Sequence, residues 1–350
     1  MVDTEQMRIK EHENRIRSGY MWALFCAILW GLWYIPGEVV WTVEPFVGMY
    51  DEISVGIPGD APMVIVAALV TAFNALTVII ALMVWNGTLL RLPELGRTLR
   101  EFKPCSKWFL IGSVCGGPIA IFGSFMAMAF IGGAFAAVAG LLYPVVGAVT
   151  ANLWYGEKIT KRAAVGILVI IGGGVTIFAG GLINDIQSAQ GVAWLGYLGG
   201  AMAALGWGLE GAIAGVGLEV SESDAGLTAR FVFELLLWWI IIIPALAIAG
   251  FPMLKYTALV LQSPIALLVL IFAGITFGFC YVSWYKSFPL IGVGRGQAVA
   301  NLYGLMSVIF LFLFLGSTPA WTVFVGGILC IAGAFIMFTE ESLEIETLRG

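Results

Sequence analysis

The feature that most limits the fold of this chain is a series of ten long apolar segments. Each is about 20 residues or longer, the length at which a helix crosses the hydrocarbon core of a bilayer. The segments are 20–40, 62–86, 108–130, 133–154, 163–183, 192–215, 227–249, 264–287, 292–315 and 319–338. Only 11% of the 350 residues are charged, too few to cover the surface of a soluble domain. The sequence therefore predicts an all-α polytopic membrane protein with ten transmembrane helices.

The two halves of the chain repeat one another. Residues 133–178 have the same layout as a stretch that starts 160 residues later, so that Tyr143 falls on Tyr303 (303 − 143 = 160). Near the start of each half, Ala-x-x-Trp-Gly places Trp30 and Trp207 at equivalent positions (207 − 30 = 177). Five helices per half, an odd number, force the halves into opposite orientations. We expect repeats at 20–183, with an external loop at 41–61, and at 184–338, between polar tails at 1–19 and 339–350.

The motifs of the first repeat resemble those of a known family. A proline near the middle of an apolar helix (Pro144), a Gly-Glu-Lys-Ile-Thr turn at 156–160 and a glycine-rich last helix are similar to the EamA-type repeat of the drug/metabolite transporter superfamily. The Trp-Gly pair in the first helix of each half also resembles that family. The resemblance covers roughly residues 20 to 338 and implies a central cavity lined by the first, third, fourth, sixth, eighth and ninth helices. These motifs shape helices and do not mark a ligand.

The distribution of Lys and Arg predicts the orientation. With the N-terminus in the cytoplasm, Lys255 alone of the 17 basic residues falls outside (17 − 1 = 16). Such a bias is what the positive-inside rule requires, so we expect both termini in the cytoplasm and a location in the cytoplasmic (inner) membrane. The 1–19 tail has no apolar core with a cleavage site, so we expect no signal peptide.

Charged residues inside apolar spans are costly and need a reason. Glu210 lies in the sixth helix with no basic residue within a turn and with Trp207 on the same face. It suits proton coupling or pairing with a cationic substrate; the alternative is a structural hydrogen bond. Glu38 ends the first helix after Pro36-Gly37, where it either gates the outer mouth or reaches to the interface. Arg230 and Glu234, four residues apart, are expected to pair.

Trp30 and Trp207 lie near mid-span rather than in interfacial belts, whereas for Trp284, near the cytoplasmic end of the eighth helix, belt and cavity are both open. Rings beside a carboxylate form an electron-rich site for an alkylated ammonium, whereas the alternative is packing or contact with lipid. Asn301 is a polar group of the second half alone, which favours the cavity. The candidate substrate-binding residues are Trp30, Trp33, Tyr34, Tyr143, Trp207, Glu210, Trp284, Asn301 and Tyr303, with Glu210 and Glu38 as candidates for coupling and gating.

Three further segments give weaker indications. The acidic 41–61 segment reads as a solvated loop or as a flap that concentrates cations, and the glutamates of the C-terminal tail read as solvated. Arg295 stands among glycines that leave it uncrowded, which is the main indication of an anionic substrate.

Composition excludes several function classes. A net charge of −5 provides no surface for nucleic acid, and one histidine with five scattered cysteines indicates no metal, cofactor or catalytic centre. No GxxxxGK[ST] motif is present, so ATP would not drive transport. We expect no enzyme but a secondary active or facilitative transporter of a small polar metabolite, monomeric or homodimeric, with protons as the candidate coupling ion. A cationic or zwitterionic amine is favoured; a neutral metabolite, an organic anion, drug export and, less favoured, a channel are the alternatives.

Overall fold

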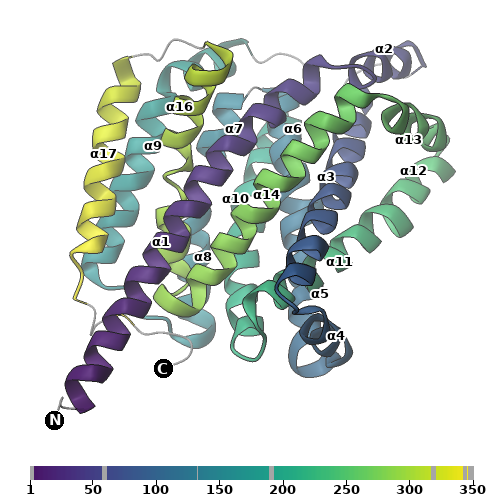
Figure 1. Ribbon diagram of the computed structural model, residues 1–350. Coiled ribbons are helices and arrows are strands. Elements are labelled where there is room, and N and C mark those ends of the chain that lie inside the picture. Colours follow the sequence, from purple (N-terminus) through teal and green to yellow (C-terminus); the bar gives the residue numbers. More distant parts are fainter. Residues whose placement is uncertain are drawn as a thin grey trace.

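The computed structural model describes residues 4–56, 61–131, 133–188, 193–316, 321–341 and 345, and its regular elements are helices that run between two opposite ends of the molecule (Figure 1). Among these residues, nine helices are long and apolar enough to cross a membrane. The remaining predicted span, 163–183, lies within the 28-residue helix α9 (Lys161–Ser188). The chain is therefore a multi-pass integral membrane protein, as predicted.

The first half supplies five crossings, several of which consist of more than one element. They are α1 (Thr4–Val39), α3 (Ala61–Thr88), then α5 (Lys107–Val114) with the π-helical η3 (Cys115–Ile121) and α6 (Phe122–Phe130), then α7 (Gly133–Gly140) with α8 (Tyr143–Tyr155), and α9. Between the second and third crossings lie α4 (Leu92–Arg100) and the π-helical η2 (Phe102–Ser106).

The second half has the same plan. Its crossings are α10 (Ala193–Leu218), then α11 (Ser223–Leu236) with the π-helical η4 (Leu237–Ile242) and α12 (Ile243–Ile248), then α14 (Pro264–Ile291), then α15 (Val293–Ala300) with α16 (Tyr303–Leu315), and α17 (Trp321–Phe338). The short helix α13 (Met253–Gln262) precedes α14.

The packing of the helices has the two-fold symmetry of an inverted repeat. Helix α1 packs on α14 and α16 of the second half, and α10 packs on η3, α6 and α8 of the first half. Helices α9 and α17, the last crossings of the two halves, pack on each other. A Cβ atom on Gly326 would lie 2.5 Å from the carbonyl oxygen of Gly173, so this pair of helices approaches too closely for a larger residue at Gly326.

The repeat is visible in the helix ends. Gly156 ends α8 and Gly316 ends α16, both in the left-handed conformation (φ 73° and 68°), at equivalent positions (316 − 156 = 160). Glycine takes this conformation without steric cost and commonly closes a helix in this way. Both halves therefore end their fourth crossing with the same turn.

The fourth crossing of each half is interrupted, although the sequence predicted continuous helices. The first break lies at Leu141-Leu142 and the second at Asn301-Leu302, which are equivalent positions (301 − 141 = 160). Pro144 explains the first break because it has no N–H for the carbonyl of Gly140 four residues earlier. The amide nitrogen of Asn301 donates to the carbonyl of Leu141 at 2.7 Å, so one break provides a hydrogen bond for the other.

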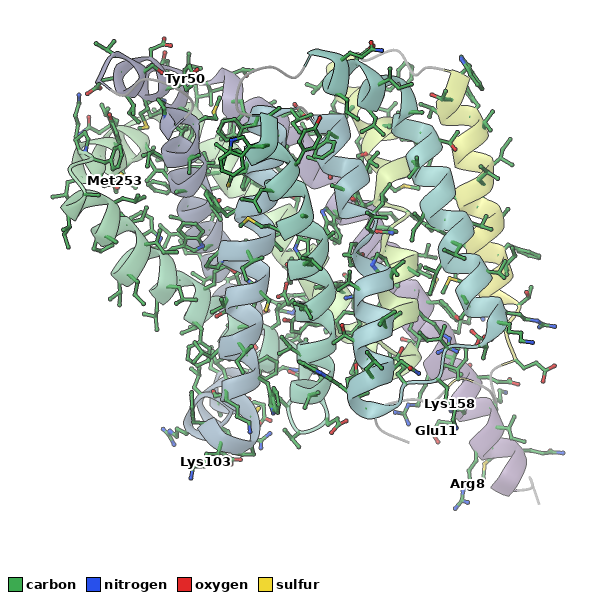
Figure 2. All side chains as sticks on the ribbon, turned by 180° about the vertical axis from the view of Figure 1, so that it is seen from behind. Arg8, Glu11, Tyr50, Lys103, Lys158 and Met253 are labelled. Atoms are coloured by element: carbon green, nitrogen blue, oxygen red, sulfur yellow. The ribbon has the colours of Figure 1, made fainter. Side chains whose placement is uncertain are left out.

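Two ends of the molecule can be distinguished. The terminal end carries the start of α1 at Thr4 and the end of α17 at Phe338, together with the labelled Arg8, Lys103 and Lys158 (Figures 1 and 2). The α2 end carries α2 (Phe46–Gly56) and α13, where Tyr50 and Met253 are labelled (Figure 2).

The structure adds detail to the predicted N-terminal tail and corrects the external loop. Helix α1 begins at Thr4, so the described part of the predicted 1–19 tail is helical and continuous with the first crossing. The described part of 41–61 is not a solvated loop: it contains η1 (Val40–Thr42) and α2, whose Phe46, Met49 and Ile53 are buried. Glu52 of α2 forms an ion pair with Lys255 of α13 at 2.7 Å. Residues 57–60 lie outside the described residues.

Candidate functional site

Five of the predicted aromatic residues meet at the centre of the molecule, and Trp30 lies in the middle of them. The ring of Trp30 stacks on Tyr303 with centroids 4.6 Å apart and meets Trp207 edge to face at 5.0 Å. Tyr143 lies at 5.5 Å and Trp284 at 6.3 Å from the same ring. All five side chains are at most 1% exposed. We call these five residues the central ring cluster.

The repeat explains why these rings converge. Trp30 and Trp207 are equivalent residues of α1 and α10, and Tyr143 and Tyr303 are the first residues of α8 and α16, directly after the two helix breaks. Each break thus places one tyrosine against Trp30 at the centre of the molecule. Trp284 of α14 is the one member of the cluster that the repeat does not provide twice.

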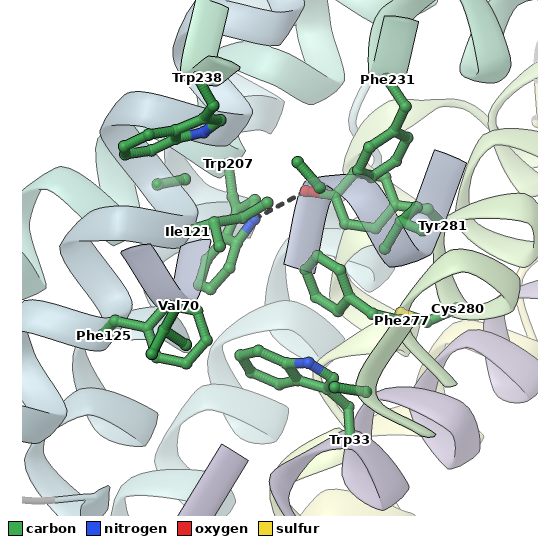
Figure 3. Packing of buried hydrophobic residues seen from close by; sticks show 14 of the residues in the cluster. Trp33, Val70, Ile121, Phe125, Trp207, Phe231, Trp238, Phe277, Cys280 and Tyr281 are labelled. Carbon is green, nitrogen blue, oxygen red and sulfur yellow. Dashed lines mark hydrogen bonds between the residues drawn. The ribbon is translucent and has the colours of Figure 1, made fainter. Parts of the chain in front are cut away.

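Trp33 and Tyr34 adjoin the cluster. Tyr34 stacks on Tyr303 at 5.7 Å, and Trp33 packs on Phe277 at 4.7 Å and on Phe125 at 5.6 Å (Figure 3). A cavity of about 10 Å³ lies beside Trp33, about the space of one water molecule. The central cavity that the resemblance predicts is thus occupied by rings in contact with one another, and the site is closed.

Five polar atoms of the residues in and around the cluster are buried without a hydrogen-bond partner among the described residues. They are the indole nitrogens of Trp30, Trp33 and Trp284 and the side-chain oxygens of Gln297 and Asn301. Gln297 itself lies at the cluster. Its side-chain Nε2 donates to the backbone carbonyl of Trp207 at 3.2 Å, and its backbone carbonyl accepts from the Tyr143 hydroxyl at 2.8 Å. Buried polar atoms without partners cost free energy, and at such positions a ligand can provide the missing bonds.

Glu210 lies beside the cluster and is connected to it by hydrogen bonds. The indole N–H of Trp207 donates to the Tyr281 hydroxyl at 2.9 Å (Figure 3), and that hydroxyl donates to Glu210 Oε2 at 2.9 Å. The Tyr285 hydroxyl donates to Glu210 Oε1 at 3.2 Å. These bonds form an unbroken path from an indole ring to a carboxylate.

Glu210 also has a charged partner that sequence reasoning missed. Arg230 Nε donates to Glu210 Oε1 at 2.6 Å, and the same guanidinium forms an ion pair with Glu234, as predicted for that pair. All three side chains are 0% exposed. The absence of a basic residue within a turn of Glu210 was therefore no guide to its partner, which comes from α11. We call Glu210, Arg230 and Glu234 the charge triad.

The remaining predicted residues lie outside the cluster. Glu38 is half-buried at the α2 end of α1, one turn beyond Tyr34. Asn301 bridges the two helix breaks rather than stacking with the rings. The sequence also did not identify Tyr281, although Tyr281 and Tyr285 are four residues apart on one face of α14, a spacing that would have indicated a shared target.

Arg295 does not face a substrate cavity. It forms a two-point ion pair with Glu340 at 2.8 and 2.5 Å and is buried, so the indication of an anionic substrate is removed. Glu340 is correspondingly not part of a solvated tail. Close by, Glu157 accepts the backbone N–H groups of Val293 and Gly294, both at 2.9 Å, and caps the N-terminus of α15. The bonds of Glu157 to Val293 and Gly294 tie the two halves together at the terminal end.

Two inverted five-helix repeats that enclose a buried centre of rings and paired charges define a membrane transporter. The sequence model of the EamA-like transporter family matches residues 55–179 and 194–339, which together exceed half of the chain. The chain therefore belongs to the EamA-like transporter family, of the drug/metabolite transporter superfamily, and is a transporter of small molecules rather than an enzyme.

Comparison with solved structures supports the same fold. A protein of known crystal structure is similar to this chain with a TM-score of 0.66 and 17% sequence identity, over 92% of this chain and 96% of that chain. At such low identity the likeness shows the fold alone. No curated protein matches the chain.

Proposed function

We propose that the protein carries a cationic or zwitterionic amine, typically a quaternary ammonium compound, by alternating access between its two repeats. The observation that carries this proposal is the central ring cluster. A cation over one aromatic face gains about 0.5–2 kcal/mol, more when water is excluded, and several rings around one point add to that gain. Each ring of the cluster lies within 6.3 Å of the Trp30 ring.

The charge beside the cluster supports a cation over an anion. With all groups ionised, the charge triad sums to −1 (−1 + 1 − 1), and Glu210 connects to Trp207 through Tyr281. A sugar is disfavoured because the mid-span amides are few. An organic anion is disfavoured because Arg295 is paired with Glu340 and Arg230 with two carboxylates.

In the proposed mechanism, repeats 20–183 and 184–338 rock against each other around the cluster. The two helix breaks, joined by the bond from Asn301 to Leu141, act as flexible points of the fourth and ninth crossings. The terminal end faces the cytoplasm of a cell whose inner membrane the chain spans, because the basic residues concentrate there. Glu38 and α2 guard the opposite mouth, and Glu210 takes part in coupling to protons.

A binding and uptake experiment tests the proposal. Purified protein is titrated calorimetrically with tetramethylammonium, and with glucose and citrate as a neutral and an anionic probe. We expect saturable binding of tetramethylammonium alone, and counterflow-accelerated uptake in proteoliposomes, which a channel does not give. Binding of glucose or citrate without measurable binding of tetramethylammonium would contradict the proposal.

A further inference from the structure

We propose that Glu234 is the proton-binding residue of this transporter, and that its proton is exchanged for the positive charge of the substrate. The inference rests on the proposed function for the identity of the substrate, but the proton site itself depends only on the charge triad. Glu210, to which sequence reasoning assigns coupling, is in this proposal the fixed carboxylate that links the proton site to the rings.

The net charge of the triad favours the binding of one proton. Two carboxylates surround a single guanidinium, and all three side chains are 0% exposed. Without a proton the group carries a charge of −1 in the interior of a membrane protein, where an unbalanced charge is costly. The guanidinium keeps its own proton in proteins, and Arg230 is held against the rings of Phe231 at 4.1 Å and Tyr281 at 5.0 Å. One bound proton on a carboxylate makes the triad neutral.

The hydrogen bonds decide which carboxylate takes the proton. Glu210 accepts three hydrogen bonds, from Arg230, Tyr281 and Tyr285, and each of its two oxygens accepts at least one of them. Three donors stabilise the ionised form of a carboxylate. Glu234 accepts from Arg230 through Oε2, whereas its Oε1 is buried with no hydrogen-bond partner within the described part of the chain. The proton therefore belongs on Glu234, whose second oxygen has no donor.

The backbone around Glu234 is irregular and closely packed. Gly117 faces it: a Cβ atom there would lie 2.7 Å from Glu234 Oε1. Gly117 belongs to the π-helical η3, and the π-helical η4 begins three residues after Glu234. Single π-helical stretches inside long helices are frequent at functional sites. The titratable and charged groups that face the triad from the neighbouring elements are Cys115, Tyr281 and Tyr285.

The hydrogen bonds between the triad and the central ring cluster explain why proton and substrate exchange for each other. A cation in the central ring cluster lies at the end of the chain Trp207–Tyr281–Glu210, and Arg230 connects Glu210 to Glu234. A positive charge at the rings supplies the neutralising charge that the proton supplies in its absence. Substrate binding therefore releases the Glu234 proton to the side on which the protein is open, and proton binding expels the cation. The protein is thus a proton–cation exchanger.

Two variants with matched chemistry test the proton site. Glu234→Gln and Glu210→Gln each replace a carboxylate by an amide of nearly the same shape. Tetramethylammonium is titrated into each purified protein in two buffers of different ionisation enthalpy, which measures the protons released per substrate bound. We expect one proton per cation and an affinity that rises about tenfold per pH unit in the original protein, and no proton release in Glu210→Gln, where Glu234 and Arg230 are already neutral together. In Glu234→Gln we expect no proton release and an affinity that changes less than about twofold.

Uphill uptake of the cation gives a second readout. In Glu234→Gln we expect it to be lost, while exchange of labelled for unlabelled tetramethylammonium persists; a merely structural defect would remove both. Glu234→Asp, which keeps a carboxyl group, should recover proton release. Proton release that persists in Glu234→Gln would overturn the assignment.

An infrared measurement separates this inference from the proposed function. Difference spectra between acid and alkaline pH report a buried protonated carboxyl group without any substrate. We expect such a band in the original protein, its loss in Glu234→Gln, a shift of its frequency in Glu234→Asp and no shift in Glu210→Asp, even if no amine binds at all. A band that Glu234→Gln retains would exclude Glu234 as the site, whatever the substrate.

Discussion

Trp33 in the first repeat and Glu210 in the second occupy equivalent positions, three residues after Trp30 and Trp207 (33 + 177 = 210). Both side chains are fully buried, but their surroundings differ. Trp33 packs on Phe125 and Phe277 beside a cavity of about 10 Å³, and its indole nitrogen has no hydrogen-bond partner within the described residues. Glu210 accepts three donors and pairs with a guanidinium.

This difference shows what duplication preserves and what it allows to change. The repeat keeps the helices, the two breaks and the four rings around the centre, because the fold depends on them. The position three residues further on has become apolar in one half and charged in the other. The cationic end of a substrate is thus expected toward Glu210, and its apolar part toward Trp33.

The largest effect on stability is expected from removing the cation that pairs with Glu210. Arg230→Met keeps the volume of the side chain but leaves two buried carboxylates without their shared cation. Removing one partner of a buried ion pair costs about 3–5 kcal/mol, so we expect a large loss of folded protein. Thermal unfolding in detergent, followed by size-exclusion chromatography, measures it.

A double variant makes that expectation specific. Glu210→Gln combined with Arg230→Met removes one carboxylate together with the cation, so that part of the lost stability should return. Double and single variants of equal stability would mean that Arg230 acts through packing and not through charge.

An intermediate effect is expected at the rings. Trp207→Ala should weaken binding of tetramethylammonium about tenfold or more, and Trp207→Phe, which keeps a weaker ring face, should weaken it less. Trp33→Ala is the matched control, because Trp33 packs against Phe277 and Phe125 instead of against Trp30. Calorimetric titration compares the three variants. An equal loss of affinity in Trp33→Ala and Trp207→Ala would remove the distinction between the two sides.

The smallest effect is expected beside Trp33. Both polar atoms of the Asn74 amide are buried without partners among the described residues, next to the 10 Å³ cavity. Asn74→Leu replaces that amide with an apolar group of similar size, so the stability should stay the same or rise by about 1 kcal/mol. Thermal unfolding checks the direction. A loss of several kcal/mol would show that the amide has an essential partner.

Much of the fold was predictable because its causes are local. Segment length fixes a membrane crossing, and the offsets between Trp30 and Trp207 and between Tyr143 and Tyr303 reveal the repeat. The breaks were harder to predict. Pro144 marks one of them, but its equivalent is Gly304, and Asn301 in the second break donates a hydrogen bond to the carbonyl of Leu141, which is distant in sequence.

The candidate site was predictable where the repeat places residues and unpredictable where side chains meet across helices. The central ring cluster follows from rings near mid-span in both halves. The pairing of Glu210 with Arg230 depends on how α10 and α11 rotate against each other, which no spacing in the sequence records. The same holds for Arg295 and Glu340. Arg295 lies in α15 and Glu340 follows the end of α17, but the two form an ion pair.

The central claim is that a cation binds among the rings around Trp30. Titration of tetramethylammonium into the purified protein and into Trp30→Ala tests it most directly, with thermal unfolding as a check that the variant folds. We predict saturable binding to the original protein and a loss of affinity of at least about tenfold in the folded variant. Unchanged affinity in folded Trp30→Ala would contradict the claim.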